Sequence, residues 1–198
     1  MLKAHDLTIG YRSNAIVEGI SFEVPSGQCV LLEGPNGSGK STLLKTIAGL
    51  QKPIAGSVES DSVRLVPSRV DRVKGFTVRE FVATSQYGYP ADATAVDRAI
   101  DKVGMATFAN RDISTLSDGE FQKVCIATAL TRPCGAILLD EPTAFLDAEG
   151  RIAVLEMLRD LSRDLGIVVM YSSHDLHDAE PLSDRIFCLK GGSFTEKR

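Results

Sequence analysis

Short apolar runs alternate with helix-like patterns along most of the chain. Before about residue 27, brief runs such as 7–9 and 20–24 alternate apolar with polar positions and are broken by glycine and proline. Such alternation is typical of antiparallel strands and turns. Compact, wholly apolar runs follow at 29–32, 136–139 and 167–171. They predict strands buried on both faces, as in a mainly parallel sheet covered by helices.

Helical spacing marks segments between these runs. Residues 40–48 form one such segment, closed by Gly49, and 152–165 form another. Thr77 and Glu80 match a capping box at the start of a further helical stretch. The apolar residues that share one face of that stretch are Val96, Ala99, Ile100 and Val103. We therefore expect a helical insertion over about residues 75–115, within a single domain spanning residues 1–198.

Composition agrees with one globular domain. The chain has 198 residues, 43% of them hydrophobic and 24% charged, with a net charge of −4. Its basic residues are scattered, so nothing in the charge favours nucleic acid as a partner. No stretch reaches the ~20 apolar residues of a membrane span, and the first residues lack the apolar core of a signal peptide. We therefore expect a cytoplasmic protein with no direct membrane insertion.

The cysteines are far apart in the sequence, and no two form a C-x-x-C pair, which argues against a zinc site or a redox motif. They are Cys29, Cys125, Cys134 and Cys188. Three of them lie in apolar surroundings, which is typical of reduced, buried thiols.

A glycine-rich segment after the run at 29–32 matches the phosphate-loop pattern G-x-x-x-x-G-K-[ST]. Backbone N–H groups of such a loop surround phosphate oxygens, and the next helix adds the positive end of its dipole. Lys40 would place a charge on the outer phosphates, Ser41 would ligate Mg²⁺ and Thr42 would contact phosphate. A structural turn, the alternative, needs neither Lys40 nor Ser41. The predicted nucleotide-binding residues here are Gly34, Pro35, Asn36, Gly37, Ser38, Gly39, Lys40, Ser41 and Thr42.

Two acids follow directly after the apolar run at 136–139. A buried strand there would deliver Asp140 and Glu141 to the carboxyl edge of the sheet, where the phosphate loop also lies. Asp140 is then a direct or indirect Mg²⁺ partner, and Glu141 is placed to polarise a water for attack on a γ-phosphate. A solvated acidic turn after a strand is the alternative interpretation.

Residues 116–120 carry a helix start. Ser117 and Glu120 match a capping box, and Leu116 with Phe121 matches a hydrophobic staple. These features need no function. Gly119 does not fit that interpretation, because a glycine in the first turn costs roughly 0.5–1 kcal/mol relative to alanine unless something approaches the backbone closely.

In their order along nearly the whole chain, these motifs resemble those of ATP-binding-cassette (ABC) ATPases, with residues 116–120 matching the family's signature motif. The resemblance implies a phosphate-loop NTPase (RecA-like) core, a small antiparallel β-subdomain and a helical insertion. It also implies a head-to-tail homodimer, or a dimer with a second ABC subunit. In that dimer each ATP lies between the phosphate loop of one subunit and Ser117, Gly119 and Glu120 of the other.

The resemblance extends to isolated residues that spacing alone would leave as structural. His174 matches the switch histidine that contacts the γ-phosphate, which makes Lys40, Glu141 and His174 the expected catalytic residues. Asp147 matches the loop that communicates across the dimer. Tyr11 matches the aromatic residue that stacks on adenine, although a tyrosine that ends a β-run is also typical of packing.

The chain departs from the family pattern at a few positions. Ser68 stands where a glutamine normally contacts Mg²⁺ and senses the transmembrane partner, and its hydroxyl is too short for the same reach. Asp118 replaces a more usual glycine and Glu120 a common glutamine. Carboxylates suit a helix N-terminus but would repel ATP, so we predict that both side chains point away from the nucleotide.

Function follows from the same resemblance. The expected protein is an ATPase that powers solute transport through a separate transmembrane permease, lying peripherally on the inner face of the membrane. Residues 76–82 and 87–90 are most similar to ATPase subunits that import iron chelates, haem or cobalamin. A soluble assembly factor switched by nucleotide and a poorly hydrolysing regulatory subunit remain alternatives. The resemblance also implies that the solute does not contact the ATPase subunit, so the sequence does not identify the solute.

Overall fold

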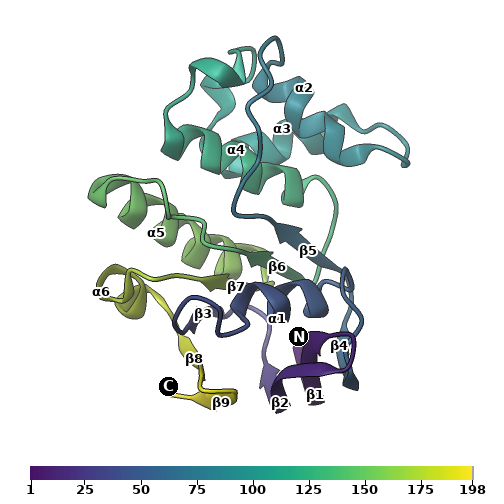
Figure 1. Cartoon of the computed structure of the whole chain (residues 1–198). Helices are drawn as coiled ribbons and strands as arrows, with labels where there is room; N and C mark the ends of the chain where they lie inside the picture. The colour runs from purple at the N-terminus through teal and green to yellow at the C-terminus, as the bar shows by residue number, and fades with distance from the viewer. Residues whose placement is uncertain (198) are drawn as a thin grey trace.

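A computed structural model describes residues 1–197 of the chain, arranged as two sheets with covering helices and a separate helical layer (Figure 1). The larger sheet has the strand order β5-β6-β7-β3-β8-β9. Its strands are β3 (Cys29–Glu33), β5 (Val63–Val66), β6 (Ala136–Leu139), β7 (Val168–Ser172), β8 (Arg185–Lys190) and β9 (Ser193–Glu196). All neighbours in it run parallel except β8 and β9. The mainly parallel sheet expected from the apolar runs is confirmed.

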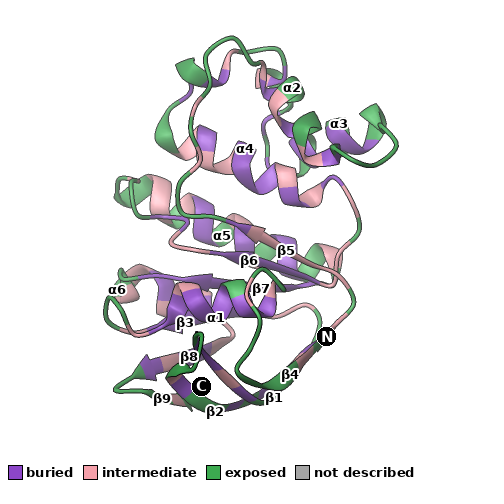
Figure 2. Cartoon of the chain, turned by 45° about the vertical axis from the view of Figure 1, so that its right-hand side comes forward, coloured by how far each residue is buried: buried purple, intermediate pink, exposed green. Residues whose placement is uncertain are grey.

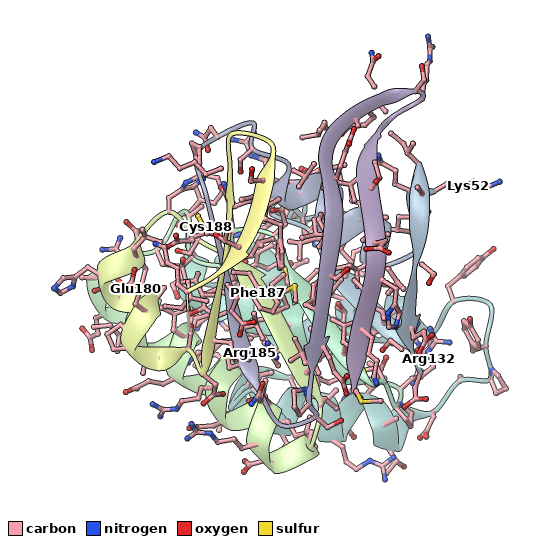
Figure 3. The ribbon with its side chains drawn as sticks, turned by 90° about the horizontal axis from the view of Figure 1, so that it is seen from below. Lys52, Arg132, Glu180, Arg185, Phe187 and Cys188 are labelled. Atoms are coloured by element: carbon pink, nitrogen blue, oxygen red, sulfur yellow. The ribbon has the colours of Figure 1, made fainter. Side chains whose placement is uncertain are left out.

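The smaller sheet is antiparallel, with the order β2-β1-β4. It consists of β1 (Leu2–Tyr11), β2 (Asn14–Val24) and β4 (Ala55–Ser60). Aromatic side chains join it to the larger sheet, because the ring centroids of Phe22 and Phe187 lie 5.1 Å apart and Phe194 lies 5.1 Å from Phe187. Figure 3 shows Phe187 between the β8–β9 hairpin and the antiparallel strands.

The helices are α1 (Lys40–Ile47), α2 (Val78–Ala83), α3 (Ala93–Lys102), α4 (Asp118–Leu130), α5 (Ala148–Leu165) and α6 (Leu176–Ala179). Short 3-10 turns lie at Thr84–Gln86, Ala106–Phe108, Ile113–Thr115 and Glu180–Leu182. Both predicted capping boxes are present, at Thr77 and Glu80 of α2 and at Ser117 and Glu120 of α4. Helix α5 starts at its N-cap Asp147 and ends at Gly166, whose φ of 60° suits glycine.

Strands buried on both faces divide the core into two clusters. Leu31, Ile137 and Val169 pack into a cluster with α4, α5 and the helical layer, whereas Val30, Leu138 and Met170 pack with α1 and the antiparallel sheet. Successive strand residues point to opposite faces. This is why the apolar runs at 29–32, 136–139 and 167–171 contain no polar position, and Figure 2 shows these strands buried.

Helices α2, α3 and α4 lie together in a layer on one side of the sheet (Figure 1). The apolar face predicted for α3 is buried there, with Val96, Ala99 and Ile100 each at most 2% exposed. The helical layer expected over about 75–115 therefore includes α4 as well. Residues 67–76 connect β5 to this layer.

Candidate functional site

The phosphate loop joins the carboxyl end of β3 to the start of α1. Gly34 has φ 148°, and a Cβ there would lie 2.3 Å from the carbonyl oxygen of Leu189 and 2.7 Å from Ser38 Oγ. No larger residue fits that space. Gly39, with φ 104°, is the N-cap of α1, so the loop turns directly into the helix whose first residues are Lys40 and Ser41.

Lys40 lies inside this loop, where its Nζ donates to the carbonyl oxygens of Gly34 at 2.7 Å and Pro35 at 3.2 Å. Burial lowers the pKa of the Lys40 ammonium, and the carboxylates of Glu141 and Asp140 oppose that shift. The Ser38 hydroxyl oxygen is buried without a hydrogen-bond partner among the described residues. A charged amine and an unpaired hydroxyl in a loop of backbone N–H groups fit a phosphate ligand.

The two acids follow β6 and are held by a buried serine of the next strand. Ser172 Oγ donates to Asp140 Oδ1 at 2.9 Å and accepts from the Glu141 N–H at 2.8 Å. Glu141 has φ 51°, a left-handed conformation that costs a non-glycine residue about 1–3 kcal/mol. Ser172 is fully buried, so its two hydrogen bonds help to hold this strained backbone.

His174 follows β7 and reaches the same point, with its Nε2 2.5 Å from Glu141 Oε1. Both side chains are partly exposed, at 39% for His174 and 30% for Glu141. Since β6, β7 and β3 are neighbours in the sheet, their carboxyl ends bring the acids, the histidine and the phosphate loop to one edge. The sequence predicted this convergence from the strand order of a parallel sheet.

Tyr11 lies at the end of β1, 56% exposed, and its hydroxyl is 3.4 Å from Thr42 Oγ1 in α1. The ring is thus beside the phosphate-loop helix and open to solvent, a position from which it could stack on a nucleotide base. Its assignment to adenine remains a prediction.

Metal binding at this edge would depend on the nucleotide. No group of three or more His, Cys, Asp or Glu side chains within residues 1–197 could hold a metal ion by itself. Mg²⁺ is usually held by one or two protein oxygens together with substrate phosphates. The Ser41 hydroxyl and the Asp140 carboxylate, at the same edge as the phosphate loop, fit that donor set.

The signature segment lies apart from this edge. Ser117 Oγ accepts from the Glu120 N–H at 3.2 Å, and Glu120 Oε2 accepts from the Ser117 N–H at 2.7 Å. Between Ser117–Glu120 and the phosphate loop, the described residues show no hydrogen bond, and Figure 1 places α4 and α1 in different layers. The two halves expected to enclose ATP are therefore not brought together within one chain.

Neighbouring residues have structural partners. The Asp118 carboxylate pairs with Arg72, and the Glu120 carboxylate accepts a hydrogen bond from the Ser117 N–H. That both carboxylates point away from a bound nucleotide stays a prediction. Asp147 is exposed and its Oδ1 accepts from the Gly150 N–H at 2.8 Å as the N-cap of α5. Its predicted role between subunits also remains a prediction.

Sequence reasoning missed two residues at the site. Ser172 ends a wholly apolar strand, and no local pattern indicated its role, because that role depends on the register that places it opposite Leu32 beside the phosphate loop. Arg72 lies in a segment without helix or strand, four residues after Ser68, and no local pattern indicated its partners. Ser68 itself is exposed and lines, with Glu141, a cavity of about 220 Å³.

Comparison with known proteins agrees with these motifs. A family model described as ABC transporter matches residues 17–144. The achromobactin transport ATP-binding protein CbrD of Dickeya dadantii is 33% identical over 207 residues, covering 93% of this chain and 77% of that protein. Other relatives at 32–35% identity are named for import of iron(3+)-hydroxamate, spermidine/putrescine, cobalamin and zinc.

Solved structures give the same result. An inward-facing transporter described as metal-chelate type contains a chain with a TM-score of 0.89 and 26% identity, covering 100% of this chain and 82% of that one. A dimeric ATP-binding cassette, MJ0796, bound to ADP and Pi has a TM-score of 0.81 and 25% identity, covering 100% of this chain and 99% of that one. Within residues 1–197, no helix is long and apolar enough to span a membrane.

Proposed function

This chain belongs to the ABC transporter family, and from that premise we propose that it is the ATP-hydrolysing subunit of an importer for a metal chelate. ATP-binding subunits of this family are ATPases that work with a membrane permease and bind ATP, generally with Mg²⁺. The observation that carries the catalytic part is the convergence of Lys40, Glu141 and His174 at one sheet edge.

Each residue has a distinct task in this proposal. The loop at 34–42 and the amides at the start of α1 bind the phosphates, and Lys40 neutralises the outer ones. Glu141 accepts a proton from the attacking water, in an orientation held by Ser172 and by contact with His174. Ser41 and Asp140 would hold Mg²⁺, which supplies charge neutralisation when bound. Tyr11 contributes an aromatic face for the base.

A second subunit completes the site. Ser117 and the first turn of α4 lie in a different layer from the phosphate-loop helix of their own chain, and Ser117, Gly119 and Glu120 line an open surface pocket together with Asp147, where a partner could present ATP. The dimeric MJ0796 cassette has the same fold. We infer a head-to-tail dimer, either of two copies or with a second ABC subunit, in which Asp147 communicates between the halves.

The most specific part of the proposal is the class of solute that the importer carries. The names of the iron(3+)-hydroxamate import relative and of the metal-chelate type transporter support a chelated metal, as does the sequence similarity at 76–82 and 87–90. Docking on a permease would place the protein on the inner face of the membrane, with the solute contacting only the permease.

The catalytic assignment predicts that Glu141→Gln will lower kcat for MgATP by about 10²–10⁴-fold. Binding of ATP should persist, because the phosphate loop is unchanged. Phosphate release and nucleotide titration measure the two effects, with exposed Glu156→Gln on α5 as the matched control. A wild-type protein without ATPase activity, or a glutamine variant with full activity, would contradict the catalytic assignment.

Transport is tested separately by purifying the native complex from detergent-solubilised membranes. We expect an integral membrane permease to copurify and, in proteoliposomes, to take up a metal chelate when ATP is present. Copurification of only a soluble partner would instead support the assembly-factor function.

A further inference from the structure

A single arginine fastens the start of α4 to the segment that follows β5. Arg72 Nη1 donates to the carbonyl oxygen of Leu116 at 2.8 Å, and Nη2 pairs with the Asp118 carboxylate. The guanidinium carbon lies 4.7 Å from the ring centroid of Phe121. We call this set of contacts the Arg72 clamp. The planar guanidinium of Arg72 thus contacts Leu116, Asp118 and Phe121, which lie just before and within the first turn of α4.

The other end of the same segment is tied to the catalytic acids. The Asp140 N–H donates to the carbonyl oxygen of Val66 at 3.1 Å, at the point where the segment leaves β5. Three residues later, the Arg69 guanidinium carbon lies 5.5 Å from the ring centroid of Phe145, in the loop that follows Glu141. Residues 66–72 therefore form a direct link between the acid pair and the signature helix.

A cavity lies where this link crosses between the layers. The 220 Å³ cavity has Asp118 and Phe121 on its α4 side and Glu141 and Phe145 on its core side. Side chains that face a cavity lose contacts with the opposite wall. Leu116 and Phe121 are buried in the core, so packing holds that side of the first turn of α4, and the Arg72 clamp adds contacts on the side that faces the cavity and the acids.

We propose that Arg72 is a positioning residue, which holds the first turn of α4 in the orientation that engages ATP bound to a partner subunit. This inference rests on the proposed function, because it assumes that Ser117 and the amides of α4 contact that ATP. It also assigns a role to Asp118, whose carboxylate would otherwise add an unpaired negative charge near the phosphates.

The geometry explains why an arginine occupies this position. A guanidinium donates in two directions from one rigid plane and can lie flat on an aromatic ring, whereas a lysine ammonium is a compact charge without such a plane. The Arg72 side chain is 29% exposed and that of Asp118 is 62% exposed, so the ion pair alone contributes little. The carbonyl contact and the stacking on Phe121 are therefore as important as the charge.

The test places Arg72→Met in a Glu141→Gln background, in which ATP is bound but not turned over. We expect ATP-driven dimerisation, measured by analytical ultracentrifugation, to weaken about tenfold or more, while ATP affinity of the monomer stays unchanged. In the wild-type background kcat should fall roughly 10- to 100-fold, as for a misplaced catalytic contact, with little change in KM. Equal dimerisation and kcat in Arg72→Met and wild type would overturn the proposal.

Arg79→Met is the matched control, because Arg79 also carries a single charge pair, 2.8 Å from Asp97, and its other side-chain hydrogen bond is to Asn110, so neither partner belongs to α4. It should dimerise and hydrolyse ATP as the wild type does. Arg72→Lys should rescue activity only in part. Asp118→Asn and Arg72→Met should be non-additive when combined, as expected for residues in one set of contacts. Additive effects would contradict a joint role.

Hydrogen exchange in the nucleotide-free protein keeps this inference separate from the proposed function. Amides at 118–121 should exchange faster in Arg72→Met than in wild type or Arg79→Met, whether or not the protein hydrolyses ATP. Unchanged exchange at 118–121 would overturn the positioning role. Faster exchange throughout the protein, together with a lower melting temperature, would also overturn it, because the substitution would then have destabilised the whole fold. Faster exchange in a protein that never dimerises would instead contradict the proposed function.

Discussion

At the scale of single residues, Gly119 is unexplained by its own chain. A Cβ at this position would meet no atom closer than Leu146 Cδ2 at 4.0 Å, and its backbone is helical. Gly150, in the first turn of α5, differs because a Cβ there would lie 2.8 Å from Asp147 Oδ1. No contact within residues 1–197 requires glycine at 119, which is consistent with the proposed close approach of a nucleotide bound to a partner.

Gly119→Ala is expected to stabilise the isolated protein but to impair its ATPase activity. The substitution should raise the free energy of unfolding by about 0.5–1 kcal/mol, because alanine favours the helix and meets no clash. ATP-driven dimerisation and kcat should nevertheless fall. Thermal melting and phosphate release measure both, and Gly150→Ala should instead lower stability. A Gly119→Ala protein with full ATPase activity would contradict an intermolecular role.

At the scale of elements, helices α2 and α4 begin with the same capping box. Thr77 with Glu80 and Ser117 with Glu120 each form both reciprocal hydrogen bonds. Hydrogen bonds from Thr77 lower the pKa of the Glu80 carboxyl, which keeps that cap ionised. The two helix starts share the same pair of capping hydrogen bonds, so the caps alone do not distinguish the functions of the two helices.

Cap removal should separate structure from function in these two helices. Thr77→Ala and Ser117→Ala should each cost about 1 kcal/mol of stability, the usual contribution of an N-cap. Only Ser117→Ala should also weaken ATP-driven dimerisation, because its hydroxyl is the proposed contact with nucleotide. Chemical denaturation and ultracentrifugation provide the comparison. Equal loss of dimerisation in both variants would show that stability alone accounts for the effect.

At the scale of the whole molecule, the burial of ionisable groups in the sheet and in α4 makes stability depend on pH at high pH. Burial raises the pKa of the Cys29 thiol from 9.0 to about 12, with a further contribution from Asp184, and burial likewise raises that of Cys125 to about 12. The pKa of the Tyr171 phenol is also raised by its burial. All cysteines within the described residues are free, but only Cys29 and Cys125 are buried, whereas the sequence predicted three buried thiols.

Stability should therefore fall on the alkaline side. A group whose folded pKa exceeds its unfolded pKa binds more protons in the folded state, so its contribution is complete below about pH 9 and is lost towards pH 12. Each thiol can contribute a slope of up to about 1.4 kcal/mol per pH unit in that window. Urea unfolding from pH 8 to 11 tests this, and Cys125→Ala should reduce the slope. A constant free energy of unfolding up to pH 11 would contradict it.

The sequence by itself determined three central strands, two capping boxes and the phosphate-loop motif, because these depend on local patterns, whereas it did not predict β4, β5, β8 or β9. Wholly apolar runs identified β3, β6 and β7, and parallel order alone placed Lys40, Glu141 and His174 at one edge. Tertiary structure decided what depends on contacts between distant segments. Ser172 supports Asp140 and Glu141 from 31–32 positions away, and Arg72 reaches Asp118 across 46. Such contacts follow no periodicity, so only the folded arrangement could reveal them.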